Sequence, residues 1–371
     1  MTTSETGGEP GTGEVDRDCF VHHGTDVEMR WDGVDSTQFC TPTEAFFVRN
    51  HTSTPVVDPA TYRLSVYGDG LRAAPTSEQA IRFSLDELRA MPARTITSAL
   101  ECTGNGRRFF DSQQASPAPG TDWALGAIGV ATWGGVPLAE VLHRAGVVAE
   151  AIEVMAVGLD EPYVHERVDH GRVRRPIPVA KALDDVLVVL EMNGEPLPPD
   201  HGFPARLLVP GWVGVASIKW LGELEVSTQP MTSPWNTVFY RLRGEEYGAE
   251  GAALDVLPVK SAFELSWNAT LRAGSVTVLR GRSWSGAAAI ESVEVSLDGG
   301  DSWVSPTLFG PNERHGWARW ELAWTPPAPG HYELLARATD RSGRRQPDTV
   351  PFNADGYLFW AVVRHPVTVR A

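Results

Sequence analysis

The sequence predicts an α+β domain followed by an immunoglobulin-like β-sandwich. At 371 residues the chain exceeds the size at which one hydrophobic core usually keeps growing, so we expect more than one domain. Strand-like runs and short helical patterns mix over the first two thirds, whereas short alternating strands fill the last third. We therefore predict a polar N-terminal arm over residues 1–40, an α+β domain over residues 41–250 and a β-sandwich over residues 251–371.

Short elements separated by many glycines and prolines make up the predicted α+β domain. A helix is expected after Ser84, because a serine followed three residues later by Glu87 is an N-terminal capping pattern. The apolar spacing of residues 137–142 predicts a second helix, and the polar stretch 245–253 predicts a linker. Apolar runs predict strands over residues 62–67, 152–157, 186–192 and 206–209.

The predicted β-sandwich rests on regular alternation of polar and apolar residues between turns such as residues 298–301, with sequence DGGD. Tryptophan and tyrosine side chains are expected to fill the space between its sheets. Strands are predicted over residues 275–280, 290–297, 317–324, 331–339 and 359–369.

The composition limits the partners and the compartment. A formal net charge of −15 excludes nucleic acid, whose binding requires a basic surface. No apolar run approaches the roughly 18 residues of a membrane-spanning helix. The three cysteines, Cys19, Cys40 and Cys102, are too few for a disulfide framework, and the N-terminus has no leader pattern. We therefore expect a cytoplasmic protein.

Residues 102–107, with sequence CTGNGR, place Cys102 between an apolar run and two glycines. A thiolate is a soft ligand suited to a redox-active metal, and glycines allow the backbone to approach a bulky cofactor. A small buried cysteine before a turn is the alternative that these six residues leave open.

Other motifs fail on their spacing. His165 and His170 are five residues apart, whereas a zinc-protease helix needs four, and residues 281–286 lack the second glycine of a hydrolase nucleophile elbow. Phe109 stands where a dinucleotide-binding loop needs its third glycine, and no haem-attachment motif occurs. We therefore expect no NAD, no flavin and no haem.

Eight short sequence blocks, in order along the chain, match motifs of a known family. On these blocks the chain from about residue 40 to its end resembles the sulfite oxidase family of molybdenum enzymes. The resemblance implies a sulfite-oxidase-type molybdopterin domain before the sandwich. The blocks are residues 47–51 (FVRNH), 102–107 (CTGNGR), 123 with 126–129 (W and GAIG), 192–197 (MNGEPL), 201–206 (HGFPAR), 219–221 (KWL), 235–240 (WNTVFY) and 293–303 (VEVSLDGGDSW).

The resemblance also implies the site. Cys102 would be the protein ligand of molybdenum, and Arg49, Arg107, Trp123 and Tyr240 would be the catalytic or substrate-pocket residues. A phosphate-bearing pterin calls for cationic partners, which agrees with His201, Arg206 and Lys219. The implied cofactor-binding residues are Phe47, Val48, Arg49, Asn50, His51, Asp160, His201, Arg206, Ser217, Ile218 and Lys219.

The implied reaction is oxygen-atom transfer, with sulfite oxidised to sulfate and electrons passed to a separate acceptor such as a cytochrome c. Homodimerisation through the sandwich is also implied. Two departures bear on the substrate: Gly106 replaces the first arginine of the cysteine motif, and Asp355 stands where animal sulfite oxidases present a third pocket arginine. Reduction of nitrate or an S-oxide, and a molybdopterin-binding scaffold without redox activity, are the alternatives.

Overall fold

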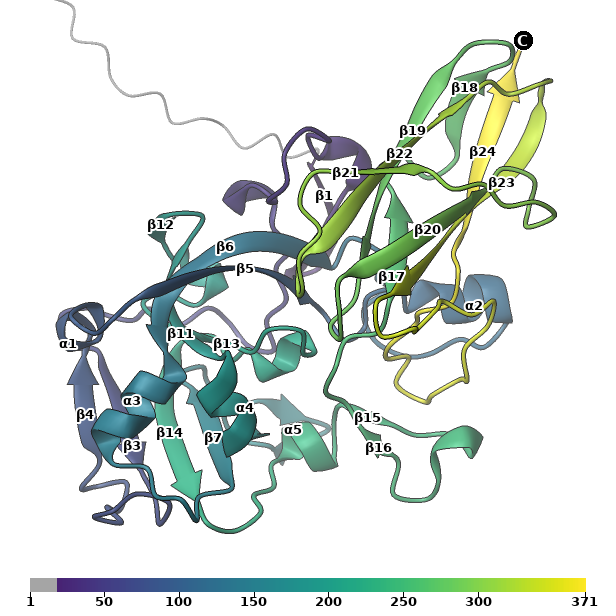
Figure 1. The fold of residues 1–371 in the computed structure, drawn as a ribbon. Helices are drawn as coiled ribbons and strands as arrows, with labels where there is room; N and C mark the ends of the chain where they lie inside the picture. The colour runs from purple at the N-terminus through teal and green to yellow at the C-terminus, as the bar shows by residue number, and fades with distance from the viewer. Residues whose placement is uncertain (1–18) are drawn as a thin grey trace, which may run out of the picture.

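The computed structural model describes residues 19–371, so the first 18 residues of the predicted arm lie outside the described residues. The chain forms two parts (Figure 1). Residues up to about 250 build a mixed sheet and an antiparallel sheet with short helices, at the lower left of the view. The remaining residues build two further sheets at the upper right, where the C-terminus lies.

The first sheet has five strands in the order β10-β7-β14-β3-β4, of which β14 and β3 pair in parallel. Three helices, α1 (Leu85–Arg89), α3 (Leu138–Ala145) and α4 (Val179–Asp184), share its buried core through apolar side chains such as Leu88 and Leu142. The strands are β3 (Arg63–Tyr67), β4 (Ile81–Ser84), β7 (Glu153–Gly158), β10 (Arg174–Pro178) and β14 (Leu221–Ser227).

The second sheet has the order β12-β11-β6-β5, with β13 paired to β11. Its strand β5 ends at Glu101, so Cys102 is the first residue of the following turn, and β13 begins at Arg206. The sheet thereby brings together motifs that are about one hundred residues apart in sequence. The strands are β5 (Arg94–Glu101), β6 (Ile128–Pro137), β11 (Leu187–Met192), β12 (Glu195–Pro196) and β13 (Arg206–Leu208).

Two four-stranded sheets make up the C-terminal part, in the orders β17-β19-β22-β21 and β18-β24-β23-β20. Their facing side chains form one apolar core, in which Trp320 and Val295 are fully buried. The strands are β17 (Lys260–Phe263), β18 (Ala269–Arg272), β19 (Thr277–Trp284), β20 (Ile290–Ser296), β21 (Thr307–Phe309), β22 (Trp317–Trp324), β23 (Gly330–Asp340) and β24 (Arg364–Arg370).

Smaller elements lie between and beside the sheets. Helix α2 (Arg108–Gln114) follows the cysteine motif, and α5 (Pro234–Thr237) precedes Tyr240. The hairpins are β1 (Phe20–His23) with β2 (Asp26–Met29), β8 (Val164–His165) with β9 (Val168–Asp169), and β15 (Arg241–Leu242) with β16 (Ala252–Ala253). Short 3-10 helices span Trp31–Gly33, Thr43–Ala45, Pro199–His201, Gly214–Ala216 and Glu245–Tyr247.

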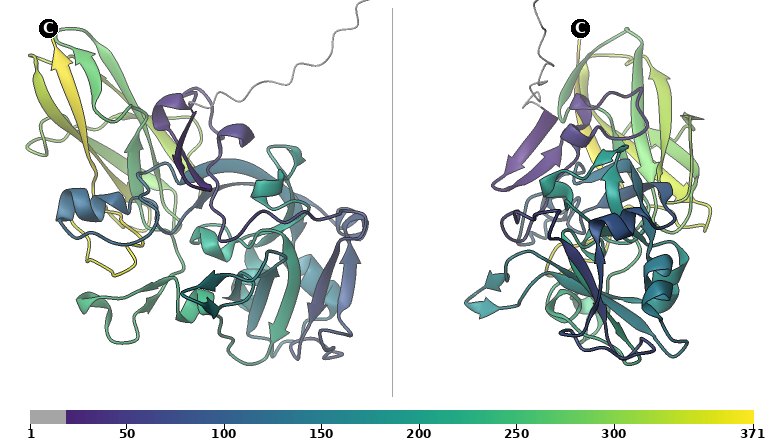
Figure 2. Two further views of the ribbon diagram at one scale, coloured as in Figure 1. Left: turned by 180° about the vertical axis from the view of Figure 1, so that it is seen from behind. Right: turned by 90° about the vertical axis from the view of Figure 1, so that its left-hand side faces the viewer.

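The prediction of a polar arm over residues 1–40 needs correction where the structure describes it. Hairpin β1–β2 lies at the junction of the two parts (Figure 2). Glu28 is buried and accepts hydrogen bonds from the backbone N–H groups of Ala124 and Gly126 at 3.1 and 2.8 Å. Glu28, one of the acids that give this segment its polar composition, therefore binds backbone donors in the interior and does not face solvent.

The local element predictions agree with the structure in most places. Ser84 and Glu87 form the expected capping box at the start of α1, and β22 has the predicted bounds. The last strand was predicted from residue 359 but begins at Arg364, because Phe359 is buried against Phe109 and Phe110 instead of extending the sheet. No helix in residues 19–371 has the length and apolar character to cross a membrane.

Candidate active site

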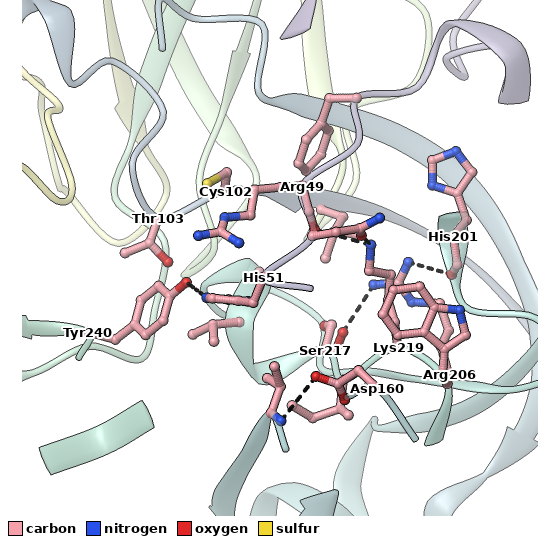
Figure 3. Close-up of a pocket in the computed structure, with 18 residues that line it drawn as sticks. Arg49, His51, Cys102, Thr103, Asp160, His201, Arg206, Ser217, Lys219 and Tyr240 are labelled. Carbon is pink, nitrogen blue, oxygen red and sulfur yellow. Dashed lines mark hydrogen bonds between the residues drawn. The ribbon is translucent and has the colours of Figure 1, made fainter. Parts of the chain in front are cut away.

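A pocket opens where the turns after β5, β7 and β13 converge, and Figure 3 shows the side chains that line it. Its empty volume, counted with the open mouth, is about 730 Å³, within the usual range for cofactor sites. The sequence-predicted site residues among its lining are Phe47, Arg49, Asn50, His51, Cys102, Asp160, His201, Arg206, Ser217, Ile218, Lys219 and Tyr240.

Cys102 lies on a tight turn fixed by backbone hydrogen bonds. Its N–H donates to the carbonyl of Ala127 at 2.8 Å, and its carbonyl accepts from the N–H of Asn105 at 2.9 Å. Burial raises the pKa of the thiol, and the nearby cation of Arg49 acts in the opposite direction. Gly106 has a φ of +92°, a conformation that side-chain-bearing residues rarely adopt, so a glycine suits this turn.

Arg49 presents an unpaired guanidinium beside Cys102 (Figure 3). Among residues 19–371 no carboxylate lies within ion-pair distance of it. Burial lowers its pKa, but the ionisable neighbours Tyr240 and Asp26 outweigh burial, so the pKa is raised and the group stays charged. This end of the pocket therefore joins a soft sulfur ligand to a cation that is available for an anion.

His51 and Tyr240 form the opposite wall. The Tyr240 hydroxyl and His51 Nε2 are 2.8 Å apart, and burial followed by the charge of Arg49 lowers the pKa of His51 well below its usual range. The imidazole is therefore neutral at neutral pH, and its Nε2 can accept a hydrogen bond from the Tyr240 hydroxyl. The ring of Tyr357 stacks on that of Tyr240 at 5.1 Å.

The far end of the pocket holds two further buried cations, Arg206 and Lys219. Arg206 donates to the carbonyls of His201 and Ser217 at 2.9 and 3.1 Å, and burial lowers its pKa to about 9. Lys219 donates to Asn50 Oδ1 and to two backbone carbonyls, and burial followed by repulsion from Arg206 lowers its pKa. In the described chain neither group has a carboxylate ion-pair partner.

Two buried polar groups on the pocket wall, the Asp160 carboxyl and the Thr103 hydroxyl, have an oxygen atom without a hydrogen-bond partner among the described residues. Asp160 accepts from the N–H of Val173 through Oδ2 at 3.2 Å, whereas its Oδ1 is buried without a partner among the described residues. The hydroxyl of Thr103 is likewise unpartnered there. Burial raises the pKa of Asp160 to about 6. Such groups are costly to bury unless a ligand completes their hydrogen bonds.

Three sequence-predicted residues lie outside the pocket lining. Val48 pairs through its backbone with Val27 of β2. Trp123 is fully buried in the apolar cluster against which Cys102 packs, so it supports the wall from behind. Arg107 also lies behind the wall, where Nη1 donates to the Thr121 carbonyl at 2.8 Å and the guanidinium lies over the ring of Tyr357.

Asp355 lies beside Arg107, behind the pocket wall. Its backbone carbonyl accepts from Arg107 Nε at 3.1 Å, and its carboxylate lies 3.4 Å from Arg243 Nη1. Burial raises the pKa of Asp355, and the cations Arg243 and Arg107 act against that shift. The acid at this position is thus compensated by Arg243 and lies outside the lining of the pocket.

Sequence reasoning missed Asp26 and Glu28, the two acids of β2 that hold the site's loops. Asp26 accepts from the N–H of Asn50 at 3.3 Å and from the hydroxyl of Thr121 at 3.0 Å. The available signal was the pair of acids in the short alternating run 26–29, which favours a strand. Thr103, inside the cysteine motif, was also missed as a lining residue.

The donor set fits a molybdopterin. The sulfur of Cys102 faces the pocket at one end. The basic side chains of Arg206 and Lys219, which have no carboxylate ion-pair partner among the described residues, face it at the other end, where a phosphate would supply the negative charge. The unpartnered oxygen of Asp160 can accept a hydrogen bond from a pterin N–H. Within residues 19–371 no group of three or more His, Cys, Asp or Glu side chains could hold a metal ion unaided. Cys102 would therefore bind the metal together with ligands from the cofactor.

Comparisons with known proteins agree with this fit. Residues 51–235 match the family model for an oxidoreductase molybdopterin binding domain, and residues 252–369 match the Mo-co oxidoreductase dimerisation domain. Human mitochondrial sulfite oxidase is 38% identical over 331 residues, which cover 84% of this chain and 58% of that protein. Sulfite oxidase of Gallus gallus is 37% identical over 344 residues, 84% of this chain and 69% of that protein.

Two other similarities define the range of the family. The nitrate reductase of Ulva prolifera is 30% identical over 338 residues, 83% of this chain and 38% of that protein. The sulfane dehydrogenase SoxCD of Paracoccus pantotrophus superposes with a TM-score of 0.77 at 27% identity, covering 91% of this chain and 82% of that one. The chain thus spans little more than half the length of the human relative. It belongs to the sulfite oxidase family of molybdopterin-dependent oxidoreductases.

Proposed function

We propose that the protein oxidises sulfite to sulfate and passes the electrons to a separate acceptor, such as a cytochrome c. The observation that carries the proposal is the guanidinium of Arg49 beside Cys102, which has no carboxylate partner among the described residues and lies in a pocket that fits a molybdopterin. The relatives named sulfite oxidase support the same substrate. Sulfite and water give sulfate, two protons and two electrons, so the reaction needs an electron acceptor.

The protein residues would bind the anion and control its position. When bound, the molybdenum cofactor supplies two-electron oxygen-atom transfer. Arg49 would bind sulfite oxygens through charge-assisted hydrogen bonds, and the hydroxyl of Tyr240, held by His51, would orient them. Arg107 would add positive potential from behind the wall, since its N–H donors are directed at backbone carbonyls.

Reduction of a singly charged anion such as nitrate is a second candidate, and Asp355 is the observation that favours it. With an acid at the third arginine position, compensated by Arg243, the pocket has fewer free cations than a doubly charged anion would favour. The similarity to a nitrate reductase is consistent with this alternative.

The same proposal includes the assembly and the compartment. Residues 252–369 match a dimerisation domain, which supports a homodimer. The two stacked four-stranded sheets support an immunoglobulin-like class for that part. Three free cysteines support a reducing compartment such as the cytoplasm.

Metal content and turnover in one preparation test the proposal. We expect stoichiometric molybdenum together with sulfite-dependent reduction of ferricyanide or cytochrome c. Arg49→Gln should raise the KM for sulfite at least about tenfold, since a charge-assisted hydrogen bond contributes about 1.5–3 kcal/mol. Arg144→Gln, which removes an exposed arginine paired with Glu140, is the control and should leave KM unchanged.

The alternatives give different results in the same assay. Turnover of nitrate or an S-oxide with a reduced viologen dye, without sulfite oxidation, would favour the reductase. Full molybdenum occupancy with turnover in neither direction would favour the scaffold.

A further inference from the structure

A buried ion pair crosses from the C-terminal sheets to the turn that carries Cys102. Lys260, the first residue of β17, places its Nζ 2.7 Å from Glu101 Oε1. The exposed fractions of the two side chains are 2% and 0%. Glu101 directly precedes Cys102, so the contact joins the part matched by the dimerisation domain to the proposed metal ligand.

Every polar atom of this pair is engaged. Glu101 Oε2 accepts from Trp284 Nε1 at 2.9 Å, and Oε1 also accepts from Asn105 Nδ2 at 2.9 Å. Lys260 Nζ donates in addition to the backbone carbonyl of Asn105 at 2.8 Å. Two residues from the C-terminal sheets, Lys260 and Trp284, therefore hold both ends of the turn 101–105.

The network continues to the backbone of Cys102 itself. Asn105 Oδ1 accepts from the N–H of Ala127 at 3.0 Å, and the carbonyl of Ala127 accepts from the N–H of Cys102 at 2.8 Å. A change in the position of the carboxylate would thus shift Asn105 and, through Ala127, the backbone that sets the direction of the thiol.

A purely structural role would not require this placement. Buried ion pairs contribute little to stability compared with well-packed apolar residues, because desolvation of both charges offsets their attraction. The C-terminal part already has a large apolar core of its own. The pair is instead located where fixed geometry matters for a metal ligand, since outer hydrogen-bond partners orient the ligands of metal sites.

We propose that Glu101 and Lys260 are positioning residues for Cys102, through which the C-terminal sheets fix the geometry of the molybdenum ligand. The proposal rests on the assignment of Cys102 as that ligand and holds for any substrate. A change in the pair should therefore alter the metal's coordination as well as the stability of the protein.

Spectroscopy on the purified holoenzyme tests the proposal. Lys260→Met and Glu101→Gln are compared with the wild type by electron paramagnetic resonance of the one-electron-reduced molybdenum, prepared by chemical titration so that no substrate is needed. Metal content and thermal unfolding are measured on the same samples. We expect altered g values in both variants, and after dialysis each variant should retain about tenfold less molybdenum than the wild type. The spectrum of Lys260→Arg should return toward that of the wild type.

Arg282→Met is the matched control. Arg282 is also on a strand of the same sheet, is fully buried and pairs with Glu264, but it touches neither the cysteine turn nor the pocket. It should lower the unfolding temperature while leaving the spectrum unchanged. If Lys260→Met and Glu101→Gln lower stability like the control and retain the wild-type spectrum and metal content, the pair is only structural and the proposal is wrong. Glu101→Gln preserves side-chain shape, so it provides the spectrum if Lys260→Met does not fold.

Discussion

Replacing Arg206 by methionine should have different effects on the protein with and without its cofactor. Arg206 is 2% exposed, lines the pocket and donates its strong hydrogen bonds to the carbonyls of His201 and Ser217. In the cofactor-free protein the buried charge lacks a carboxylate partner among the described residues. In the loaded protein, a phosphate on the cofactor would compensate that charge.

The magnitude follows from the pKa of Arg206. Burial lowers this pKa from 12.5 to about 9, which corresponds to about 5 kcal/mol of destabilisation of the charged form. Two charged hydrogen bonds of about 2 kcal/mol each offset most of this, so Arg206→Met should change the stability of the cofactor-free protein by no more than ~2 kcal/mol. In the loaded protein the variant leaves a buried phosphate without its partner, at a cost of about 3–5 kcal/mol.

Thermal unfolding of protein from cofactor-competent and cofactor-deficient hosts measures both effects. The gap in unfolding temperature between the two forms should narrow by roughly 6–10 °C in Arg206→Met, at about 2 °C per kcal/mol. Arg175→Met is the control: Arg175 is also buried and bonded to two carbonyls, but it lies outside the pocket lining and should lower both forms equally. An unchanged gap in Arg206→Met would refute the assignment of Arg206 to the cofactor.

Three further predictions concern single side chains of the pocket. Cys102→Ser should abolish turnover while the pterin, measured by its fluorescence after release, is retained; residual wild-type turnover would contradict the ligand assignment. Tyr240→Phe should lower kcat/KM for sulfite about tenfold or more at unchanged molybdenum content, because it removes the hydroxyl held by His51. The folded-state pKa of Asp160, about 6, lies above its ordinary value of 3.8, so the folded protein binds the extra proton and this residue's contribution to stability falls as pH rises from about 4 to 6. In the cofactor-free protein, Asp160→Asn should remove up to about 3 kcal/mol of this decline in the free energy of unfolding, measured by denaturant unfolding. If the wild type and the variant lose the same free energy of unfolding between about pH 4 and 6, the raised pKa of Asp160 is contradicted.

Much of the fold was predictable because its signals are local. The capping box at Ser84 and Glu87 lies within four residues, and alternation in residues 317–324 directly predicts a strand with one face on the core. The position of Phe359 was not predictable in this way. Its apolar run reads as a strand, but partners from α2, about 250 residues earlier in the chain, draw it into a separate cluster.

The site residues likewise fall into those that the sequence predicted and those that it did not. Residues within recognisable motifs, such as Cys102 and Arg206, could be assigned from the resemblance, and the structure places them on one pocket. The acids that support those motifs could not, because their roles depend on distant partners: Glu101 and Lys260 are 159 residues apart, and Glu28 binds backbone groups 96 and 98 residues away. An acidic residue in sequence gives no indication of whether it will face solvent or a buried donor.

The distribution of these acids explains how a chain with a net charge of −15 can present a cationic pocket. Asp26, Glu28 and Glu101 lie near the site, yet their oxygens are directed at hydrogen-bond donors behind the wall. Asp160 is the one carboxylate on the described pocket lining. Arg49 and Arg206 stay charged at neutral pH without a carboxylate in ion-pair distance among the described residues, whereas burial and repulsion from Arg206 lower the pKa of Lys219. The pocket therefore presents positive groups in a protein whose net charge is negative. A bound anion therefore gains the interactions that internal ion pairs would otherwise use, and this local arrangement, not the net charge, determines which ligand the pocket favours.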